Sequence, residues 1–584
     1  MTGVDWLIVV GCVALTTGVG LWFSQRSGAG TDSFFLAGRR MPWWLLGTSM
    51  VATTFATDTP LLVADIVRTN GVAGNWVWWA FLLTGMLTTF VYAKLWRRSG
   101  TVTDLEFYEL RYSGASARAV RAFRALYLGL FFNVIVMATV LLAAIKVGSA
   151  LTSLDPLYIV LVVASAALLF SAIGGFAAVL VADVLLFILS MAGAVLAAWF
   201  ALDHPAVGGL GALIQHENLT GKLSFLPDFG NPQQALMVFV IPLAVQWWNV
   251  WYPGAEPGGG GYVAQRLLAA KNEQHATAAM LLFQVAHYAL RPWPWIIVAL
   301  ASLVVFPDID AIRSAFPAID TNVIGNDFAY PAMLKFLPAG ILGLVVASLV
   351  AACISTLSTQ INWGASYIVH DFYQRFVNPT ASNKSLIRMA RAASALLVVL
   401  AATLALALTS IIQAFSILLT IGAGTGLLFI LRWFWWRINA WSEISAMLAS
   451  FVCALSFYLG DFPYWADWQK LIASISATTL VWLLVTWLTP ATQVAVLQRF
   501  YRRIKPGGIG WKKIRRSLPV AEQATTAAPG QPLTSSLLCA FLSSISIYAL
   551  LFGTGFALYG DTPMCVLMAV LAISTGGLAW RCWR

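Results

Sequence analysis

Long apolar segments follow one another from one end of this 584-residue chain to the other. A membrane-spanning helix needs about 20 predominantly apolar residues. In lipid, the backbone polar groups must be satisfied within the protein, so such segments fold as helices. By this criterion about fifteen spans are predicted: 4–24, 43–67, 76–96, 121–151, 156–175, 177–203, 235–253, 277–306, 338–366, 390–409, 411–437, 442–460, 470–488, 536–559 and 563–582.

The composition agrees with a chain that lies in a membrane throughout its length. Hydrophobic residues make up 60% and charged residues 10%, against about 45–50% and about 25% in soluble domains. The formal charge of +11 comes from basic residues in short loops between apolar segments, where they set topology. We therefore expect no nucleic-acid partner.

The basic residues alternate between successive loops. The most basic loop, 490–534, carries eight Lys and Arg between Arg499 and Arg516, which is typical of a strip on the anionic inner leaflet. The alternation predicts an inner (plasma) membrane protein with its N-terminus outside and its C-terminus in the cytoplasm. Its predicted parts are a transmembrane core (1–489), this basic cytoplasmic loop and a C-terminal helix pair (535–584).

Two predicted spans are interrupted by residues that break helices. The second contains a polar run at 53–60 that ends in Pro60, and the seventh reaches Pro253 followed by four glycines, 258–261. Interrupted helices in matching positions of two repeats often form transporter binding sites. The two breaks lie five spans apart, which favours two five-helix repeats; ordinary proline kinks are the alternative.

Asp58 lies within the first of these breaks. A carboxylate near the middle of a bilayer costs about 2.5–3.5 kcal/mol, so it needs a partner or a function. Arg291 in the eighth span is a candidate counter-ion for a purely structural pair. Alternatively, Asp58 faces a cavity and meets a cationic group of a substrate, a metal cation or a proton.

The ninth span contains four hydroxyl side chains within five residues, at Ser355, Thr356, Ser358 and Thr359. Hydroxyls in helices often bond back to their own backbone, but this density exceeds that need. Hydroxyls together with freed carbonyls form an uncharged oxygen cage, which suits a monovalent cation.

Several segments resemble the sodium:solute symporter family, which includes sodium/proline, sodium/sugar and sodium/pantothenate transporters. They are FLAGRR at 35–40, VAQRLLAAKN at 263–272, LPAGILGL at 337–344, the hydroxyl-rich block at 352–360 and DFY at 371–373. The resemblance covers roughly residues 1–460. It implies an all-α, leucine-transporter-type core of five plus five inverted helices, with one extra N-terminal helix and about four extra C-terminal helices.

The resemblance also implies a sodium site between the first and eighth core helices. Its ligands are the carbonyls of Ala52, Phe55 and Ala352 and the hydroxyls of Ser355 and Thr356. Asp183 matches an acidic residue near the inner sodium exit, and with Ser358 and Thr359 it completes a possible second cation site.

The implied substrate pocket combines the two breaks. Its lining would be Thr57, Asp58, Trp247, Trp248, Asn249 and Trp251, with Glu256 and Arg291 as further candidates. Aromatic faces suit a sugar ring or an amine, while packing is the alternative for any single tryptophan. The insertion 253–261, Asp58 and Arg291 depart from the sugar and proline carriers, so their specificity is not transferred.

The predicted function is sodium-coupled symport of a small organic solute by alternating access, without enzymatic activity or an obligatory protein partner. A proton-coupled carrier with Asp58 or Asp183 as proton acceptor is the nearest alternative, and a transporter-like solute sensor is another. A channel would show a repeated filter or a ring of charges, and no such repeat is present in the sequence.

Overall fold

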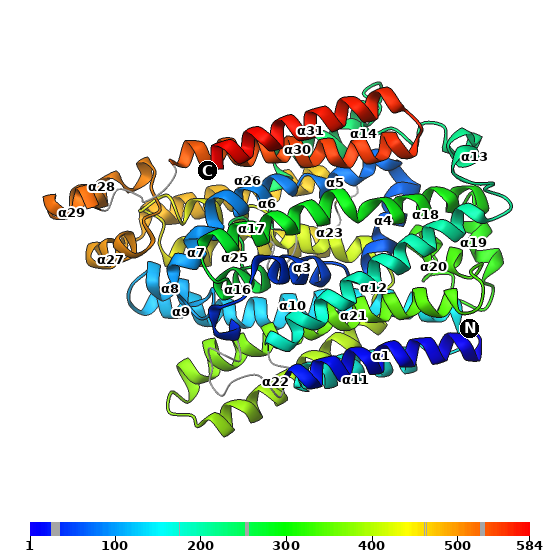
Figure 1. Cartoon of the computed structure of the whole chain (residues 1–584). Helices are drawn as coiled ribbons and strands as arrows, with labels where there is room; N and C mark the ends of the chain where they lie inside the picture. The colour runs from blue at the N-terminus through cyan, green and yellow to red at the C-terminus, as the bar shows by residue number, and fades with distance from the viewer. Residues whose placement is uncertain are drawn as a thin grey trace.

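The computed structural model describes residues 1–24, 36–173, 176–250, 256–460, 462, 464–525 and 532–583. Within these residues the chain is built of helices and contains no strand (Figure 1). One isolated bridge joins Met41 to Ala270. The prediction of an all-helical fold is confirmed.

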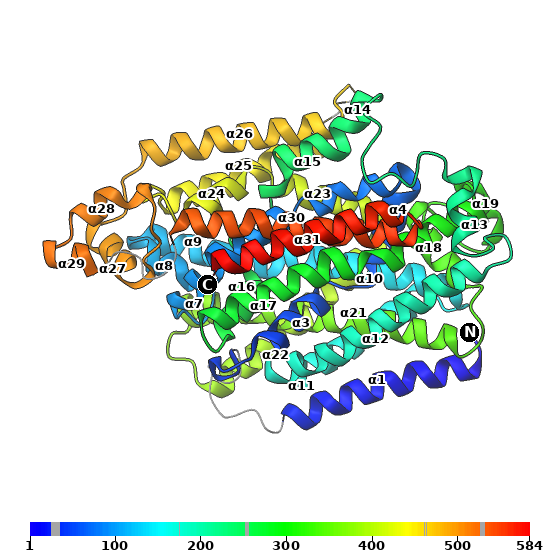
Figure 2. The ribbon, with the colours of Figure 1, turned by 45° about the horizontal axis from the view of Figure 1, so that its top comes forward.

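In the described part of the chain, nine uninterrupted helices run lengthwise through the bundle (Figures 1 and 2). They are α1 (Gly3–Ser24), α11 (Pro156–Ile173), α12 (Phe176–Asp203), α21 (Ile341–Ser366), α22 (Asn383–Ala407), α25 (Ala440–Leu459), α26 (Asp467–Leu488), α30 (Leu533–Leu558) and α31 (Thr562–Trp583).

Other spans consist of consecutive helical pieces. They are α3 (Trp43–Thr53) with α4 (Asp58–Asn70); α5 (Trp76–Trp79), α6 (Leu82–Leu87), η3 (Thr88–Tyr92) and α7 (Ala93–Ser99); α9 (Gly114–Leu126), η4 (Tyr127–Phe132) and α10 (Asn133–Leu151); α14 (Pro232–Ala235), η6 (Leu236–Val240), α15 (Ile241–Ala244) and η7 (Gln246–Trp248); α17 (Glu273–Val285), η8 (Ala286–Leu290) and α18 (Pro292–Val305); and α23 (Ile411–Ile421) with α24 (Thr425–Leu431). The helix α21 continues into η10 (Tyr367–Val377).

Shorter helices lie between the spans. They are η1 (Ala37–Arg39), η2 (Val72–Asn75), α8 (Glu106–Arg111), α13 (Leu210–Gln215), η5 (Glu217–Leu219), α16 (Gly261–Ala269), α19 (Ile309–Ala315), η9 (Asn326–Phe328), α20 (Ala329–Leu334), α27 (Val494–Ile504), η11 (Ile509–Trp511), α28 (Lys512–Arg516) and α29 (Val520–Thr525).

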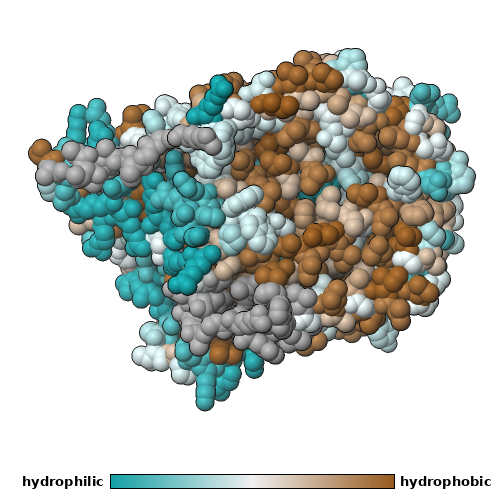
Figure 3. All heavy atoms as spheres, viewed as in Figure 1, coloured by the Kyte–Doolittle hydropathy of each residue, from teal (hydrophilic) through white to brown (hydrophobic). Residues whose placement is uncertain are grey.

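Ten helices of the described chain are long and apolar enough to cross a membrane, or twelve if the bent pairs α3/α4 and α23/α24 each count as one span. Three shorter apolar helices cover Gly3–Thr16, Pro156–Ser171 and Pro232–Ala244. Each of the fifteen predicted ranges falls on one of these helices or helix pairs. Apolar side chains cover the broad part of the surface, and hydrophilic ones gather at the end that carries α27–α29 (Figure 3).

The helix α21 occupies the middle of the bundle. It packs against α1, α3, α10, α11, α12 and α22, while α4 packs against α10 and α18. The hydroxyl-rich part of the chain is therefore surrounded by protein and shares its environment with the broken pair α3/α4.

The basic loop is docked onto one end of the bundle. Leu497, Phe500 and Ile504 on α27 are fully buried, and α27 packs against α7 and α8. Trp511 donates its indole N–H to the Trp433 carbonyl at 2.8 Å. The apolar side of α27 is thus covered by protein, and contact of its basic residues with the inner leaflet stays a prediction.

Candidate functional site

The second predicted span is broken where its polar residues lie. The helix α3 ends at Thr53, α4 begins at Asp58, and the pair is bent by 61°. Pro60 is in the first turn of α4, where its missing N–H removes no helical hydrogen bond. Backbone carbonyls at such a break lie outside the regular helical ladder and can face other ligands.

The hydroxyl-rich part of α21 lies directly against this break. Thr356 Oγ1 donates to the Thr53 carbonyl at 3.0 Å, across 303 positions of sequence. Thr57 Oγ1 donates to the Leu349 carbonyl at 2.9 Å. The residues proposed as sodium ligands are all buried: Ala52, Phe55, Ala352, Ser355 and Thr356.

Asp183 of α12 contacts both α3 and α21. Its carboxylate accepts hydrogen bonds from Ser355 Oγ at 2.7 Å and from Ser49 Oγ at 2.5 Å. The Arg266 guanidinium of α16 is 3.6 Å away, and both charged groups are fully buried. Asp183 therefore has a basic partner and holds the Ser355 hydroxyl.

Arg266 also reaches the residues expected at a second cation site. Its Nη2 donates to Thr359 Oγ1 at 3.4 Å and to Thr53 Oγ1 at 3.2 Å. Ser358 Oγ donates to the Ser355 carbonyl within its own helix at 3.0 Å. An arginine side chain thus supplies positive charge where a second cation would lie, a role that the sequence did not indicate.

The second break follows η7. Residues 256–260 are not helical, and α16 begins at Gly261. Gly258 and Gly259 have φ of +88° and +74°, which favours glycine at both positions. Trp96 Nε1 donates to the Gly258 carbonyl at 2.6 Å, which ties this segment to α7. The predicted interruption is therefore present over 256–260, while Pro253 lies outside the described residues.

Glu256 begins this non-helical segment and lies in a buried cluster of charges. Its two carboxylate oxygens accept hydrogen bonds from Arg124 at 2.7 Å and Arg432 at 3.1 Å. Glu443 lies 3.5 Å from Arg432 and accepts a hydrogen bond from Tyr112 Oη at 2.6 Å. We name these five residues the Glu256 cluster; each carboxylate in it faces at least one arginine.

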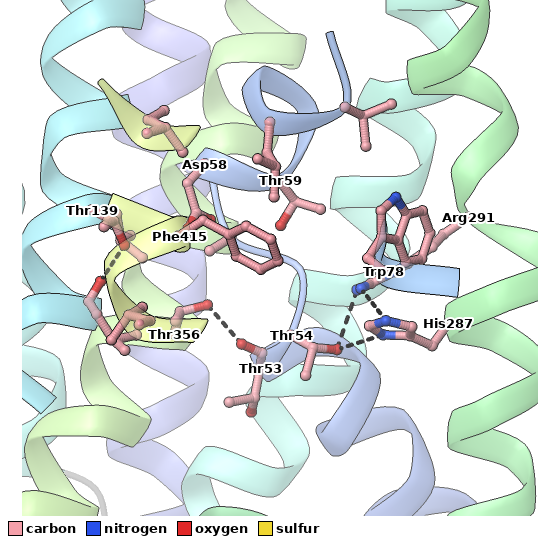
Figure 4. Close-up of a pocket in the computed structure, with 17 residues that line it drawn as sticks. Thr53, Thr54, Asp58, Thr59, Trp78, Thr139, His287, Arg291, Thr356 and Phe415 are labelled. Carbon is pink, nitrogen blue, oxygen red and sulfur yellow. Dashed lines mark hydrogen bonds between the residues drawn. The ribbon is translucent and has the colours of Figure 1, made fainter. Parts of the chain in front are cut away.

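A cavity of about 80 Å³ lies at the first break (Figure 4). Asp58 and Arg291 both line it, from opposite sides of the view. Its other residues come from the α3/α4 pair and from α5, α10, η8, α21 and α23. They are Thr53, Thr54, Ala56, Thr59, Leu62, Val63, Trp78, Val136, Thr139, Val140, His287, Thr356, Ile411, Phe415 and Leu418.

The two charged residues of this cavity are not paired with each other. Among the described residues, no basic nitrogen lies within 4.0 Å of an Asp58 carboxylate oxygen, and no acidic oxygen lies within that distance of Arg291. The Thr59 N–H and the Thr139 hydroxyl approach the Asp58 carboxylate. Asp58 and Arg291 therefore make no direct ion pair among the described residues, although their opposite charges act on each other across the cavity.

Arg291 is held by a small polar network. Its Nη1 donates to Thr54 Oγ1 at 3.2 Å and to the Val51 carbonyl at 3.4 Å. Its Nη2 is 3.2 Å from His287 Nε2, and His287 Nδ1 is 3.2 Å from Thr54 Oγ1. Arginine only donates, so Nε2 must accept and His287 is neutral with its proton on Nδ1.

The remaining predicted pocket residues lie elsewhere. Thr57 bonds to α21, as described above. Asn249 Nδ2 donates to the Leu419 carbonyl at 3.2 Å, Trp248 packs in a separate apolar cluster, and the Trp247 carbonyl accepts a hydrogen bond from Thr84. Trp251 lies outside the described residues. Trp78, Thr139, His287 and Phe415 line the cavity without having been singled out from the sequence.

Comparison with known proteins connects this architecture to transporters. The sequence model of the sodium:solute symporter family matches residues 34–450. A sodium/glucose cotransporter of Vibrio parahaemolyticus is 26% identical over 469 residues, which cover 77% of this chain and 84% of that protein. The human (Homo sapiens) sodium/myo-inositol cotransporter 2 is 27% identical over 468 residues, covering 74% of this chain and 67% of that protein.

A solved structure shares the fold. It is the substrate-bound, outward-open state of a Na⁺-coupled sialic acid symporter, with a TM-score of 0.67 at 18% identity, covering 84% of this chain and 99% of that one. At this identity the likeness concerns the fold alone, which is of the leucine-transporter type.

Proposed function

The chain belongs to the sodium:solute symporter family and is a multi-pass membrane protein that performs sodium-coupled symport; we propose that sodium binds where the α3/α4 break meets α21, and that the adjacent cavity takes the solute. The observation that carries this proposal is the contact between Thr356 and the Thr53 carbonyl at the break. This contact brings the hydroxyl-rich part of α21 against the broken helix pair, which supports a cation site between them.

The proposed sodium ligands are the carbonyls of Ala52, Phe55 and Ala352 and the hydroxyls of Ser355 and Thr356. Sodium bound there joins the broken helix to α21. Its positive charge also lies close to Asp183, whose carboxylate already holds the Ser355 hydroxyl. Such a site binds a monovalent cation without a directly coordinated carboxylate and releases it readily.

We infer a single sodium site and not two. Asp183 and Thr359 share the Arg266 guanidinium, so the positive charge that a second sodium would supply at Asp183, Ser358 and Thr359 is already present. Asp183 then acts beside the exit of the single ion. Measuring solute and ²²Na⁺ fluxes in the same vesicles gives the stoichiometry, which we expect to be 1:1.

Buried ion pairs flank the cavity towards both ends of the bundle and form candidate gates. The Glu256 cluster lies with α8 and α9 towards the end that carries α27–α29 (Figure 1). Lys146 Nζ contacts Asp327 at 2.5 Å near the end of α10, whose last residue, Leu151, accepts a hydrogen bond from the N-terminus. We place the α27–α29 end in the cytoplasm, because it carries the most basic loop. Core residues 1–489 then alternate access around the cavity, with 535–584 packed on their flank.

The energetics suffice for concentrative uptake. One charge moving through about 100 mV releases about 2.3 kcal/mol, and a tenfold sodium gradient adds about 1.4 kcal/mol. One sodium ion per cycle therefore sustains a gradient of a neutral solute, or of one with no net charge, of roughly several hundredfold.

The test of the sodium site is Ser355→Ala combined with Thr356→Ala. Sodium chloride, compared with potassium chloride, should raise the melting temperature of the purified wild-type protein. The double variant should need at least about tenfold more sodium for the half-maximal shift, because two oxygen ligands of the cation are lost and a loss of about 1.4 kcal/mol already lowers affinity tenfold. The matched control is Ser366→Ala. Ser366 lies at the end of the same helix, α21, and its hydroxyl donates to the Trp363 carbonyl. An unchanged sodium titration in the double variant removes these hydroxyls from the site.

The same titration distinguishes sodium from proton coupling. If sodium does not stabilise the wild-type protein and vesicle uptake persists without it at constant pH, Asp58 or Asp183 becomes the proton acceptor of a proton-coupled carrier. Stabilisation by sodium without any solute flux would instead favour a transporter-like sensor.

A further inference from the structure

The cavity presents one carboxylate and one guanidinium that lack ionic partners. Several other buried acidic groups in the bundle have a basic partner: Asp183 lies beside Arg266, Glu256 is bound by two arginines, and Asp327 contacts Lys146. Asp5 and Asp104 have no basic nitrogen within 4.0 Å among the described residues, but they face no such cavity and accept hydrogen bonds from backbone N–H groups or from the Tyr367 hydroxyl. Asp58 is half-buried and Arg291 is 2% exposed, so neither is fully compensated by bulk water. We propose that the transported solute is a small zwitterion, whose cationic group binds Asp58 and whose carboxylate binds Arg291. This inference rests on the proposed function of the cavity.

Arg291 has N–H donors that no group in the described part of the chain uses, and their arrangement indicates which ligand group they can bind. A guanidinium has five N–H donors. Three are directed at the Val51 carbonyl, Thr54 and His287, and the buried Nε has no partner within the described residues. The donors that remain are Nε–H and one Nη2–H. A pair of guanidinium donors is the arrangement that binds a carboxylate through two parallel hydrogen bonds.

The charge balance of the cavity also favours a zwitterion. His287 is neutral, as its contact with arginine requires, so the cavity carries one negative and one positive charge on separate walls. A neutral solute leaves both charges without a partner in a mostly apolar enclosure, and a purely cationic or anionic solute leaves one of them so. Unpaired buried charges are costly, and a site that holds them rejects ligands that cannot pair with them.

The size and lining of the cavity restrict the solute further. The cavity has a volume of about 80 Å³, which is small beside the roughly 300–1,000 Å³ of common ligand pockets. It therefore favours a small amino acid or a betaine over a larger solute. Val140, Leu418 and Phe415 supply apolar walls for an aliphatic body or for methyl groups. Aromatic rings such as Phe415 and Trp78 also tolerate a quaternary ammonium group.

The test uses purified protein in proteoliposomes with an inward sodium gradient. The probes are labelled L-proline, L-alanine and glycine betaine as zwitterions, choline as a cation, and D-glucose and myo-inositol as neutral polyols. We expect sodium-dependent uptake of at least one zwitterion and none of choline or the polyols. Sodium-dependent uptake of a polyol without any zwitterion transport overturns the proposal. So does the absence of zwitterion transport or binding while sodium still stabilises the protein.

Two variants assign the ends of the solute. Asp58→Asn should weaken zwitterion binding by on the order of tenfold to a hundredfold, because a hydrogen bond to a charged group is lost. Arg291→Gln should do the same, and Arg291→Lys should recover part of the affinity. Asp65→Asn, on the same helix but outside the cavity, is the matched control. Equal affinity in wild type and Asp58→Asn overturns the assignment of the cationic end.

The sodium titration separates failure of this inference from failure of the proposed function. Asp58→Asn should retain sodium stabilisation, because Asp58 is not among the proposed ligands. Loss of zwitterion binding with sodium stabilisation intact supports the inference. If the wild-type protein shows no response to sodium at all, the sodium site itself is wrong. If Asp58→Asn does not fold, Thr139→Val, which removes a hydroxyl beside the carboxylate, replaces it as the probe.

Discussion

The cavity and the Glu256 cluster both contain buried acids and arginines, but they arrange them in opposite ways. In the cluster, Glu256 is bound by Arg124 and Arg432 at 2.7 and 3.1 Å. In the cavity, Asp58 and Arg291 line opposite walls without an ion pair. Buried charges that pair with one another stabilise the fold, whereas charges held apart on the walls of a cavity are available to a ligand. This contrast predicts different consequences of neutralising each acid.

The largest effect should follow Glu256→Gln. Removing this carboxylate leaves two buried arginines facing only Glu443, and loss of one partner of a buried pair costs about 3–5 kcal/mol. We expect a strong fall in the melting temperature and in the yield of monodisperse protein, measured by fluorescence-detected size-exclusion chromatography during heating.

Asp58→Asn is the internal comparison for that experiment. Its melting temperature without solute should stay at or above that of the wild type, because an unpaired charge is removed. Equal destabilisation by both variants would contradict the distinction between the two regions.

The sequence predicted the breaks and the hydroxyl-rich helix because each depends on local chemistry. Pro60, the glycine run and the four hydroxyls can each be recognised within a few residues, and the family resemblance implied that the broken helix and the hydroxyl-rich helix lie together. The pairing of Glu256 with Arg124 and Arg432 could not be predicted in this way. Those partners are 132 and 176 positions away, and their meeting depends on how each helix is rotated.

Helix rotation also explains the misplaced pocket residues. Successive residues of an α-helix are turned by about 100°, so Asp58 faces the cavity while its neighbour Thr57 bonds to α21. His287 and Trp78 lie in spans whose sequences resemble ordinary apolar cores. Their contribution to the cavity becomes visible only when α3 brings Thr54 within 3.2 Å of His287.

A second, smaller effect tests whether the Lys146 and Asp327 charges stabilise the fold by pairing, as those of the Glu256 cluster do. Both side chains are almost fully buried. Lys146→Met alone should lower stability by about 3 kcal/mol, since it leaves an unpaired buried carboxylate. Combined with Asp327→Leu, stability should return close to that of the wild type, because an apolar pair of similar volume replaces the ions.

The double variant also tests the role of this pair as an outer gate. Thermal stability should recover while sodium-dependent transport slows, since an apolar contact no longer opens readily to water. Full recovery of both stability and transport would make the pair purely structural. Failure of Asp327→Leu to restore stability would show that Lys146 has a further partner in the folded state.

The smallest effect concerns the glycine segment between Glu256 and α16. Gly258 has φ of +88°, and an added Cβ would lie 3.2 Å from the Tyr92 ring. Gly258→Ala should cost about 1–2 kcal/mol through the left-handed backbone alone and should also slow turnover, because this segment lies between Glu256 and α16. Gly221→Ala is the matched control, with φ of +75° and no atom within 4 Å of its added Cβ.

Both variants should lose similar stability, but only Gly258→Ala should reduce the rate of sodium-dependent uptake. If the control slows uptake equally, stability and not local motion of the 256–261 segment limits transport, and the Glu256 cluster is then a fixed support and not a gate.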